Sequence, residues 1–124
     1  MSMTEPGAPA AITVKRKSRL VEVHFRDGEV FRLPFEYLRV YSPSAEVRGH
    51  GAGEGKLELA KERVQITQVE PIGNYAVRLH FDDGHNSGLY SWTYLYELGT
   101  DYEEKWGRYL ERCERLGYVR RPID

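Results

Sequence analysis

Apolar and polar residues alternate along two stretches of the chain, which is the spacing of a β-strand with one buried face. The first stretch covers residues 20–33 and has Asp27-Gly28 near its centre. Asp-Gly is a favoured two-residue turn, so this stretch is predicted to form a β-hairpin, with another strand before it near Ile12. Pro34 then favours the first turn of a short helix at residues 35–38.

The second stretch repeats the first. Residues 77–84 match residues 21–28, both ending in Asp-Gly, and Tyr94-Leu95 matches Tyr37-Leu38 after a shift of one residue. The sequence therefore predicts an internal duplication, in which each unit is a β-hairpin covered by a short helix. Two copies are too few for a solenoid, so the expected fold is α+β, with both units in one shared antiparallel sheet.

Two helices are predicted in the C-terminal third of the chain. Ser91 is placed to cap a short helix that Gly99 would end in the left-handed conformation. Asp101 is placed to cap a longer helix that Gly117 would end. The apolar residues of this amphipathic helix recur at three- and four-residue steps. They are Tyr102, Trp106, Tyr109, Leu110, Cys113 and Leu116.

The chain is predicted to hold one domain, because its 124 residues are 40% hydrophobic and 30% charged. We expect residues 12–118 to form this domain, residues 1–11 to be a disordered tail and residues 119–124 to be a second tail. The glycine-rich run 47–55 is interpreted as a flexible connection. No window has the ~18 apolar residues of a membrane span, and the first eleven residues lack signal-peptide features. A cytoplasmic protein is therefore expected.

The charge balance argues against nucleic-acid and membrane partners, since both require a basic face and the formal net charge is −1. The basic run at residues 15–19 is interpreted as a solvated sheet edge. Cys113 is the single cysteine, which excludes an intramolecular disulfide and fits a reducing compartment. Its place on an apolar stripe predicts a small buried thiol.

Polar side chains gather at residues 82–87, where Asp and Asn favour a structural turn more than a catalytic or metal site. By alternation, His24 and His80 point away from the core, but two imidazoles alone make a poor metal site. No motif marks an activated serine or cysteine nucleophile. We therefore expect no enzyme activity, no cofactor and no bound metal.

Nine tyrosines and two tryptophans are many for a chain of this length, and several crowd into residues 90–102. Such side chains serve either core packing or a recognition surface, and the sequence leaves both open. The candidate interaction surface combines three of them with the preceding turn. It consists of Asp83, Gly84, His85, Tyr90, Trp92 and Tyr94.

A longer pattern surrounds both Asp-Gly turns. The first block is Phe25-x-Asp27-Gly28-x-x-Phe31-x-Leu33-Pro34-x-x-Tyr37-Leu38-Arg39, and the second is Phe81-x-Asp83-Gly84-His85-x-Ser87-x-x-Tyr90-x-Trp92-x-Tyr94-Leu95. With these two blocks the chain resembles the DUF971 family over about residues 12–118. That family is similar to the N-terminal domain of γ-butyrobetaine hydroxylase.

The resemblance implies little chemistry, because the oxygenase reaction of the hydroxylase belongs to a separate jelly-roll domain. Its 2-His-1-carboxylate motif has no counterpart here. The hydroxylase's N-terminal domain holds a structural zinc through three cysteines after the Leu-Arg segment and one later histidine. After Leu38-Arg39 this sequence has no cysteine in residues 40–46, and His85 alone matches a ligand, so zinc is not expected.

DUF971 domains also look like the C-terminal appendage of certain P-loop iron–sulfur cluster carrier ATPases. The resemblance therefore implies a non-enzymatic interaction module with a protein partner, such as a carrier ATPase of this kind, in iron–sulfur or metallo-enzyme maturation. Three alternatives stay open. They are a metal-binding protein that uses His85 with His24 or His80, a regulatory or substrate-binding domain related to the hydroxylase, and a small enzyme with a deep pocket.

Overall fold

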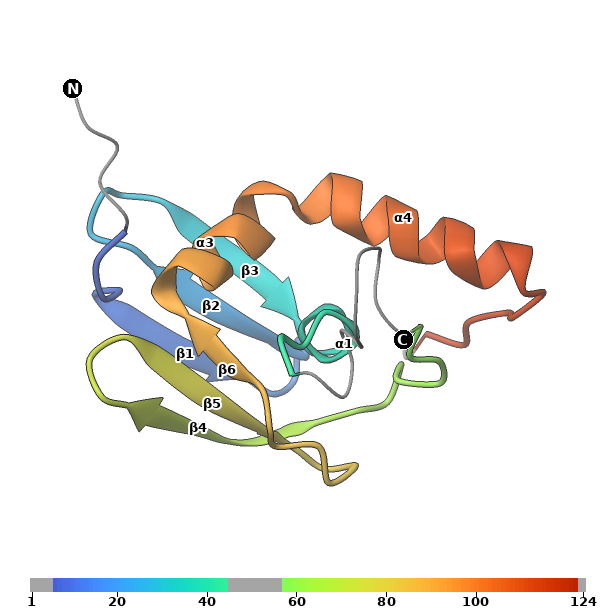
Figure 1. Cartoon of the computed structure of the whole chain (residues 1–124), viewed down its shortest axis with the longest axis horizontal. Helices are drawn as coiled ribbons and strands as arrows, with labels where there is room; N and C mark the ends of the chain where they lie inside the picture. The colour runs from blue at the N-terminus through green and yellow to red at the C-terminus, as the bar shows by residue number, and fades with distance from the viewer. Residues whose placement is uncertain (1–5, 45–56, 123–124) are drawn as a thin grey trace.

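The computed structural model describes residues 6–44 and 57–122 and has the predicted α+β class (Figure 1). Within these residues, two three-stranded antiparallel sheets pack with three helices. Sheet A contains β1 (Ala11–Lys15), β2 (Leu20–His24) and β3 (Val30–Pro34), in that order. Sheet B contains β4 (Ile66–Ile72), β5 (Ala76–Phe81) and β6 (Leu89–Ser91). The helices are α1 (Phe35–Val40), α3 (Trp92–Thr100) and α4 (Tyr102–Arg115).

The two predicted Asp-Gly turns are confirmed and share one geometry. Gly28 and Gly84 have φ angles of +96° and +90°, in the left-handed region that glycine tolerates. Asp27 Oδ1 accepts a hydrogen bond from the backbone N–H of Glu29 (2.8 Å), and Asp83 makes the equivalent bond two residues on (3.1 Å). The aspartate side chain therefore closes each turn locally.

The predicted single shared sheet is wrong, because the two units form separate sheets. Strands β1 and β4 each add a third strand to their own unit, and within the described residues no strand pairing joins the sheets. Apolar residues from both sheets, among them Val21, Val23, Val77 and Leu79, belong to one buried core. Two sheets with a common core bury both apolar faces, whereas the short α1 and α3 would leave part of a continuous six-stranded sheet uncovered.

Tyrosine hydroxyls join the two units through reciprocal hydrogen bonds. Tyr37 in α1 donates to the carbonyl of Leu98 in α3 (2.6 Å), and Tyr94 in α3 donates to the carbonyl of Tyr41 after α1 (2.6 Å). The duplicated sequence aligns the two donors, and each acceptor lies four residues after the partner tyrosine. Burial raises the pKa of Tyr37, so its hydroxyl remains a donor.

The turn aspartates repeat this exchange between units. Tyr96 in α3 donates to Asp27 Oδ2 in the first turn (2.7 Å), and Arg39 in α1 contacts Asp83 Oδ2 in the second (2.9 Å). Tyr96 and Arg39 follow the aligned Tyr-Leu pairs, so equivalent positions again contact the opposite unit. The hydrogen bond to Asp27 raises the pKa of Tyr96 to about 12.

Helix α1 is buried along its whole length, although two of its six residues are charged. Its apolar side chains contribute to the main core. Glu36 forms an ion pair with Arg120, and Arg39 forms one with Asp83. A buried charge without a partner is unfavourable by several kcal/mol. Both ion pairs therefore help to hold α1 in its buried position.

Helix α3 continues through Gly99, which the sequence analysis placed at its end. The helix runs to Thr100, and Ser91 Oγ accepts from the backbone N–H of Tyr94 (3.1 Å) as the predicted cap. A Cβ atom on Gly99 would lie 2.2 Å from the Phe31 ring. Glycine is therefore required for the close approach of α3 to β3 and not for a left-handed turn.

Helix α4 carries the predicted apolar stripe, but only part of the stripe is covered. Tyr109 and the single cysteine, Cys113, are buried as predicted, whereas Leu116 is 65% exposed. Asp101 precedes the helix without a side-chain capping bond, and Gly117 follows it with a φ of +72°. Figure 1 shows α4 extending beyond the sheets, which leaves the end of the stripe in solvent.

Arg120 and Arg121, which the sequence analysis placed in a tail at 119–124, contact the domain. Arg120 pairs with Glu36 on α1, and the backbone N–H of Arg121 donates to Glu62 Oε2 (2.8 Å). The domain therefore includes residues beyond the predicted boundary.

Two sequence predictions fall outside the described residues. They are the first part of the disordered tail, residues 1–5, and the glycine-rich connection at 47–55. None of the described helices is long and apolar enough to cross a membrane.

We predict that Gly99→Ala destabilises the protein by about 1–3 kcal/mol, because overpacking against Phe31 forces α3 or the ring to move. Gly107→Ala in α4 is the matched control, since its Cβ would meet nothing within 4 Å. Alanine is the better helix former, so the control should be stabilised by up to about 1 kcal/mol. Urea unfolding measures both variants, and equal stability of the two would contradict the close packing of α3.

Candidate functional site

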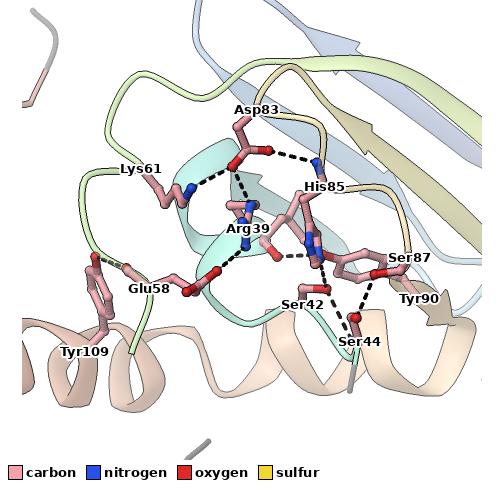
Figure 2. A network of polar contacts seen from close by, with 11 residues as sticks. Arg39, Ser42, Ser44, Glu58, Lys61, Asp83, His85, Ser87, Tyr90 and Tyr109 are labelled. Carbon is pink, nitrogen blue, oxygen red and sulfur yellow. Dashed lines mark hydrogen bonds and ion pairs between the residues drawn. The ribbon is translucent and has the colours of Figure 1, made fainter. Parts of the chain in front are cut away.

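Charged side chains from three distant parts of the chain converge at the end of α1 (Figure 2). Arg39 lies at the centre and is 5% exposed. Its Nε lies 2.9 Å from Asp83 Oδ2, and its Nη1 lies 3.1 Å from Glu58 Oε1 in an ionic contact that lacks hydrogen-bond geometry. Lys61 Nζ also contacts Asp83 Oδ2 (2.7 Å). We call these four residues the Arg39 cluster.

The charges of the Arg39 cluster balance one another, because two cations pair with two carboxylates. Partial burial opposes ionisation of Asp83, but hydrogen bonds from Lys61, from the backbone of His85 and from Arg39 outweigh it. Together they lower the pKa of Asp83 to about 2. Asp83 therefore stays ionised near neutral pH and is not poised as a general acid or base.

A chain of hydroxyl groups continues from His85. Its Nε2 lies 2.9 Å from Ser42 Oγ, which also accepts a hydrogen bond from the backbone N–H of Ser44 (3.2 Å). Ser44 Oγ lies 2.7 Å from Ser87 Oγ. Gly88 permits this fit, because a Cβ there would lie 2.4 Å from Ser42 Oγ. The connection between β5 and β6 is thus held against the end of α1, as Figure 2 shows.

Ser42, His85 and Asp83 are the residue types of a hydrolase triad but lack its geometry. Asp83 accepts from the backbone N–H of His85, and this bond does not orient the imidazole ring. Ser42 is 1% exposed, and its oxygen already accepts a backbone hydrogen bond. A nucleophile must be reachable by its substrate, so the arrangement supports packing and not acyl transfer.

Two further histidines lie on separate sheets with separate partners. His24 Nε2 is 2.7 Å from Glu22 on sheet A, and His80 Nε2 is 2.9 Å from Glu70 on sheet B. Within residues 6–44 and 57–122, no group of three or more His, Cys, Asp or Glu side chains is arranged to hold a metal ion. The alternative that joined His85 to one of these rings therefore has no ligand set in the described chain.

The side chains around His85 do not fit a zinc site like the one in the hydroxylase's N-terminal domain. The residues that follow Leu38-Arg39 include Ser42 and Ser44, and it is the Ser42 hydroxyl that lies against the imidazole. Thiolate, imidazole and carboxylate are the usual zinc ligands, and serine hydroxyls are not among them. The hydroxyl groups instead close the site through hydrogen bonds.

The structure divides the predicted interaction surface. Asp83 and Gly84 are exposed at the turn, but Tyr90 is completely buried and His85 is 8% exposed. Tyr90 donates to the carbonyl of Leu38 inside the core (2.6 Å). The prediction of Tyr90 and His85 as surface residues is therefore corrected.

Trp92 and Tyr94 lie at the boundary of the core and are partly buried. The ring N–H of Trp92 donates to the carbonyl of Asn74 (2.7 Å), and its backbone N–H donates to the carbonyl of Tyr75 (3.1 Å). Tyr75 is 54% exposed. Tyr75 was not identified from the sequence, although its position directly after the turn at Gly73 was a signal for exposure.

The sequence analysis missed most of the Arg39 cluster. Arg39 was visible only as part of the family pattern, and its partners lie far from it along the chain. The available signal was a charged residue between Leu38 and Val40, in a short helix that is otherwise mostly apolar.

Comparison with known proteins shows the family of the chain. Residues 12–96 match the family model described as gamma-butyrobetaine hydroxylase-like, N-terminal, and the chain belongs to this family. Two structures determined by NMR in solution are similar to it. One has 44% identity and a TM-score of 0.82, and the match covers 100% of this chain and 92% of that chain. The other has 42% identity and a TM-score of 0.79, with 96% and 94% covered.

A crystal structure of a DUF971-family protein of unknown function from Acidithiobacillus ferrooxidans is also similar. It has 43% identity and a TM-score of 0.60, and the match covers 73% of this chain and 91% of that chain. The resemblance to DUF971 is therefore confirmed. No match was found among curated proteins.

We predict that Asp83→Asn destabilises the protein by about 1 kcal/mol at pH 7, because the buried Arg39 loses an ionic partner and solvent screens part of the effect. The pKa of Asp83 in the folded protein is about 2, below the ordinary aspartate value of 3.8. The wild-type protein should therefore lose this stability as the pH falls from about 4 towards 2, and the variant should not.

Asp82→Asn is the matched control for this prediction. Asp82 Oδ1 accepts from the backbone N–H of Gln65 (2.9 Å), and the asparagine oxygen can do the same. The control should lose less than about 0.5 kcal/mol at pH 7. Urea unfolding from pH 2 to pH 7 tests both variants. A wild-type stability curve that runs parallel to that of Asp83→Asn below pH 4 would contradict the role of the carboxylate.

Proposed function

We propose that this chain is a non-enzymatic docking module that binds a protein partner. The observation that carries the proposal is a partly exposed aromatic pair, Tyr75 and Trp92, which lies where hydrogen bonds join the β4–β5 turn to the start of α3. We call this pair the aromatic corner. Large aromatic side chains dominate the energetics of many protein interfaces because they bury much area and keep a polar group.

The aromatic corner is held in place before any partner binds. Both N–H groups of Trp92 donate to carbonyls of the turn that carries Tyr75. The Trp92 ring is thus already oriented by a hydrogen bond, and an ordered side chain loses less conformational entropy on binding, which favours affinity. Figure 1 shows the β4–β5 turn and the start of α3 at the same end of the molecule.

The Arg39 cluster supports the non-enzymatic part of the proposal. Its charges are paired with one another, and the neighbouring Ser42 is buried. Catalytic groups are normally left accessible to substrate and have pKa values shifted towards the working pH. The shift of Asp83 goes the opposite way, which is the behaviour of a structural ion pair.

The partner that we propose is a P-loop iron–sulfur cluster carrier ATPase of the cytoplasm. DUF971 domains look like the C-terminal appendage of certain such ATPases, and a domain attached to a carrier in one protein is suited to bind a carrier as a separate chain in another. The single thiol, Cys113, is buried and free, which fits a reducing compartment. This choice of partner rests on analogy and not on the site itself.

The test is capture of the tagged chain from its native cell extract with mass spectrometry, followed by calorimetric titration of the purified carrier ATPase. We expect the ATPase to bind the wild-type chain. The double variant Tyr75→Ala/Trp92→Ala should bind at least about 30-fold more weakly, as for the loss of interface hot spots.

Val30→Ala is the control, because Val30 is an exposed apolar residue (39%) on sheet A. It should leave the affinity within about twofold. Failure of the ATPase to bind rejects the proposed partner, and full binding by the double variant rejects the aromatic corner.

A further inference from the structure

One end of the molecule gathers five basic residues that lack an acidic partner. Within residues 6–44 and 57–122, none of their side chains forms an ion pair with a carboxylate. Lys17 and Arg63 are exposed and make no side-chain hydrogen bond there either. We call this set the basic edge. It consists of Arg16, Lys17, Arg19, Arg63 and Arg121.

Hydrogen bonds to the backbone bring these residues together from three segments. Arg19 Nη2 donates to the carbonyls of Glu62 (3.1 Å) and Val64 (2.8 Å), which lie on either side of Arg63. Arg16 donates to the carbonyl of Ile66. In Figure 1 the β1–β2 turn and the segment that leads into β4 lie along the same end of the molecule. Residues 15–18 are exposed, as the interpretation of a solvated edge requires, and Arg16 and Arg19 in addition bond to the backbone of the other unit.

The C-terminal segment adds the fifth charge. The backbone N–H of Arg121 donates to Glu62 Oε2 (2.8 Å), and the hydroxyl of Tyr118 donates to the same oxygen (2.6 Å). Glu62 is therefore a carboxylate at the edge, but it is 8% exposed and its Oε2 atom already accepts two hydrogen bonds. Carbonyl groups carry no net charge, so the arginines that bind them remain cationic towards solvent.

Many other basic residues of the described chain are paired with carboxylates. Arg32 pairs with Glu22 on sheet A, and Arg108 pairs with Glu104 on α4. The whole chain has a formal net charge of −1, so the rest of the molecule is net negative. The positive charge is thus concentrated at one end, where it attracts an anionic partner in one orientation.

The backbone is strained at this edge. Arg19 and Ala60 are the two described non-glycine residues with positive φ, at +58° and +61°. Arg19 makes the hydrogen bonds to Glu62 and Val64 that hold the edge together. Ala60 lies three residues before Arg63. The left-handed region costs a non-glycine residue about 1–2 kcal/mol, and such strain concentrates at binding and functional sites.

We propose that the basic edge binds a short acidic segment of a partner protein. This inference rests on the proposed docking function and adds a second contact with its own chemistry. Five cations on one edge match a short run of Asp and Glu side chains. A nucleic acid fits less well, because Tyr118, the aromatic residue that the described chain places at this edge, is partly buried with its hydroxyl bonded to Glu62, and the rest of the molecule repels a long polyanion.

The test uses a fluorescein-labelled ten-residue peptide of alternating Glu and Gly, and measures its binding by anisotropy at low and at physiological salt. Lys17→Glu/Arg63→Glu reverses two exposed charges that make no ion pair or side-chain hydrogen bond with the other residues the structure describes. We expect the wild-type chain to bind the peptide more weakly as salt rises, and the double variant to lose about tenfold in affinity or more.

Arg108→Glu/Arg115→Glu is the matched control, because it makes the same change in net charge on the outer face of α4. Its affinity for the peptide should stay within about twofold of the wild-type value. Equal losses in the two double variants would show a net-charge effect and overturn the proposal. So would absence of peptide binding at low salt, or tighter binding of a 20-nucleotide single-stranded DNA at the same salt.

The experiments can reject the aromatic corner and the basic edge independently of each other. If Tyr75→Ala/Trp92→Ala loses the partner and the wild-type chain does not bind the acidic peptide, the docking function stands and the basic edge is rejected. If the peptide binds through the basic edge and the aromatic variant keeps the partner, the aromatic corner is rejected and the basic edge stands.

Discussion

The fold depends on neutralising two charges that α1 carries into the core. All six residues of this helix are buried, and two of them are Glu36 and Arg39. Their partners lie 84 and 44 residues further along the chain, at Arg120 and Asp83. Since an unpaired buried charge is unfavourable, the buried position of α1 is stabilised by contacts with the second unit and with the C-terminal segment. The helix therefore couples parts of the chain that share no strand pairing.

The local elements could be predicted from the sequence, and the long-range contacts could not. The alternation of apolar and polar residues and the Asp-Gly turns predicted the hairpins, because both signals depend on only a few neighbouring residues. The duplication was equally visible, but it does not say whether two units share a sheet or face each other. Gly99 was interpreted as a helix end, since no local signal shows that the Phe31 ring occupies the space of its Cβ. The polar turn that contains His85 was recognised from the sequence, but its contact with Ser42 was not, because the two residues are 43 positions apart in the chain.

The polar residues that bond to one another inside the fold are not the residues that form the two proposed binding surfaces. The residues that look most chemical, Asp83, His85 and Ser42, are held in contacts that join the second turn to α1. The exposed side chains of the proposed surfaces, such as Tyr75, Lys17 and Arg63, point to solvent instead of joining the two units. Rigidity inside the Arg39 cluster fixes the frame on which these surfaces are displayed. A rigid frame reduces the entropy lost when a partner binds.

The exchange of contacts between the units has the form of an isologous interface, in which each copy gives the other what it receives. In two separate chains such an interface makes a symmetric homodimer, and here one chain contains both halves. The N–H of Phe35 donates to the carbonyl of Arg19 (2.9 Å), and the N–H of Trp92 donates to that of Tyr75 (3.1 Å), at aligned positions. The same corner thus occurs twice, once cationic and once aromatic. A homodimer would have to repeat one chemistry at both corners, whereas a fused pair is free to divide two chemistries between them.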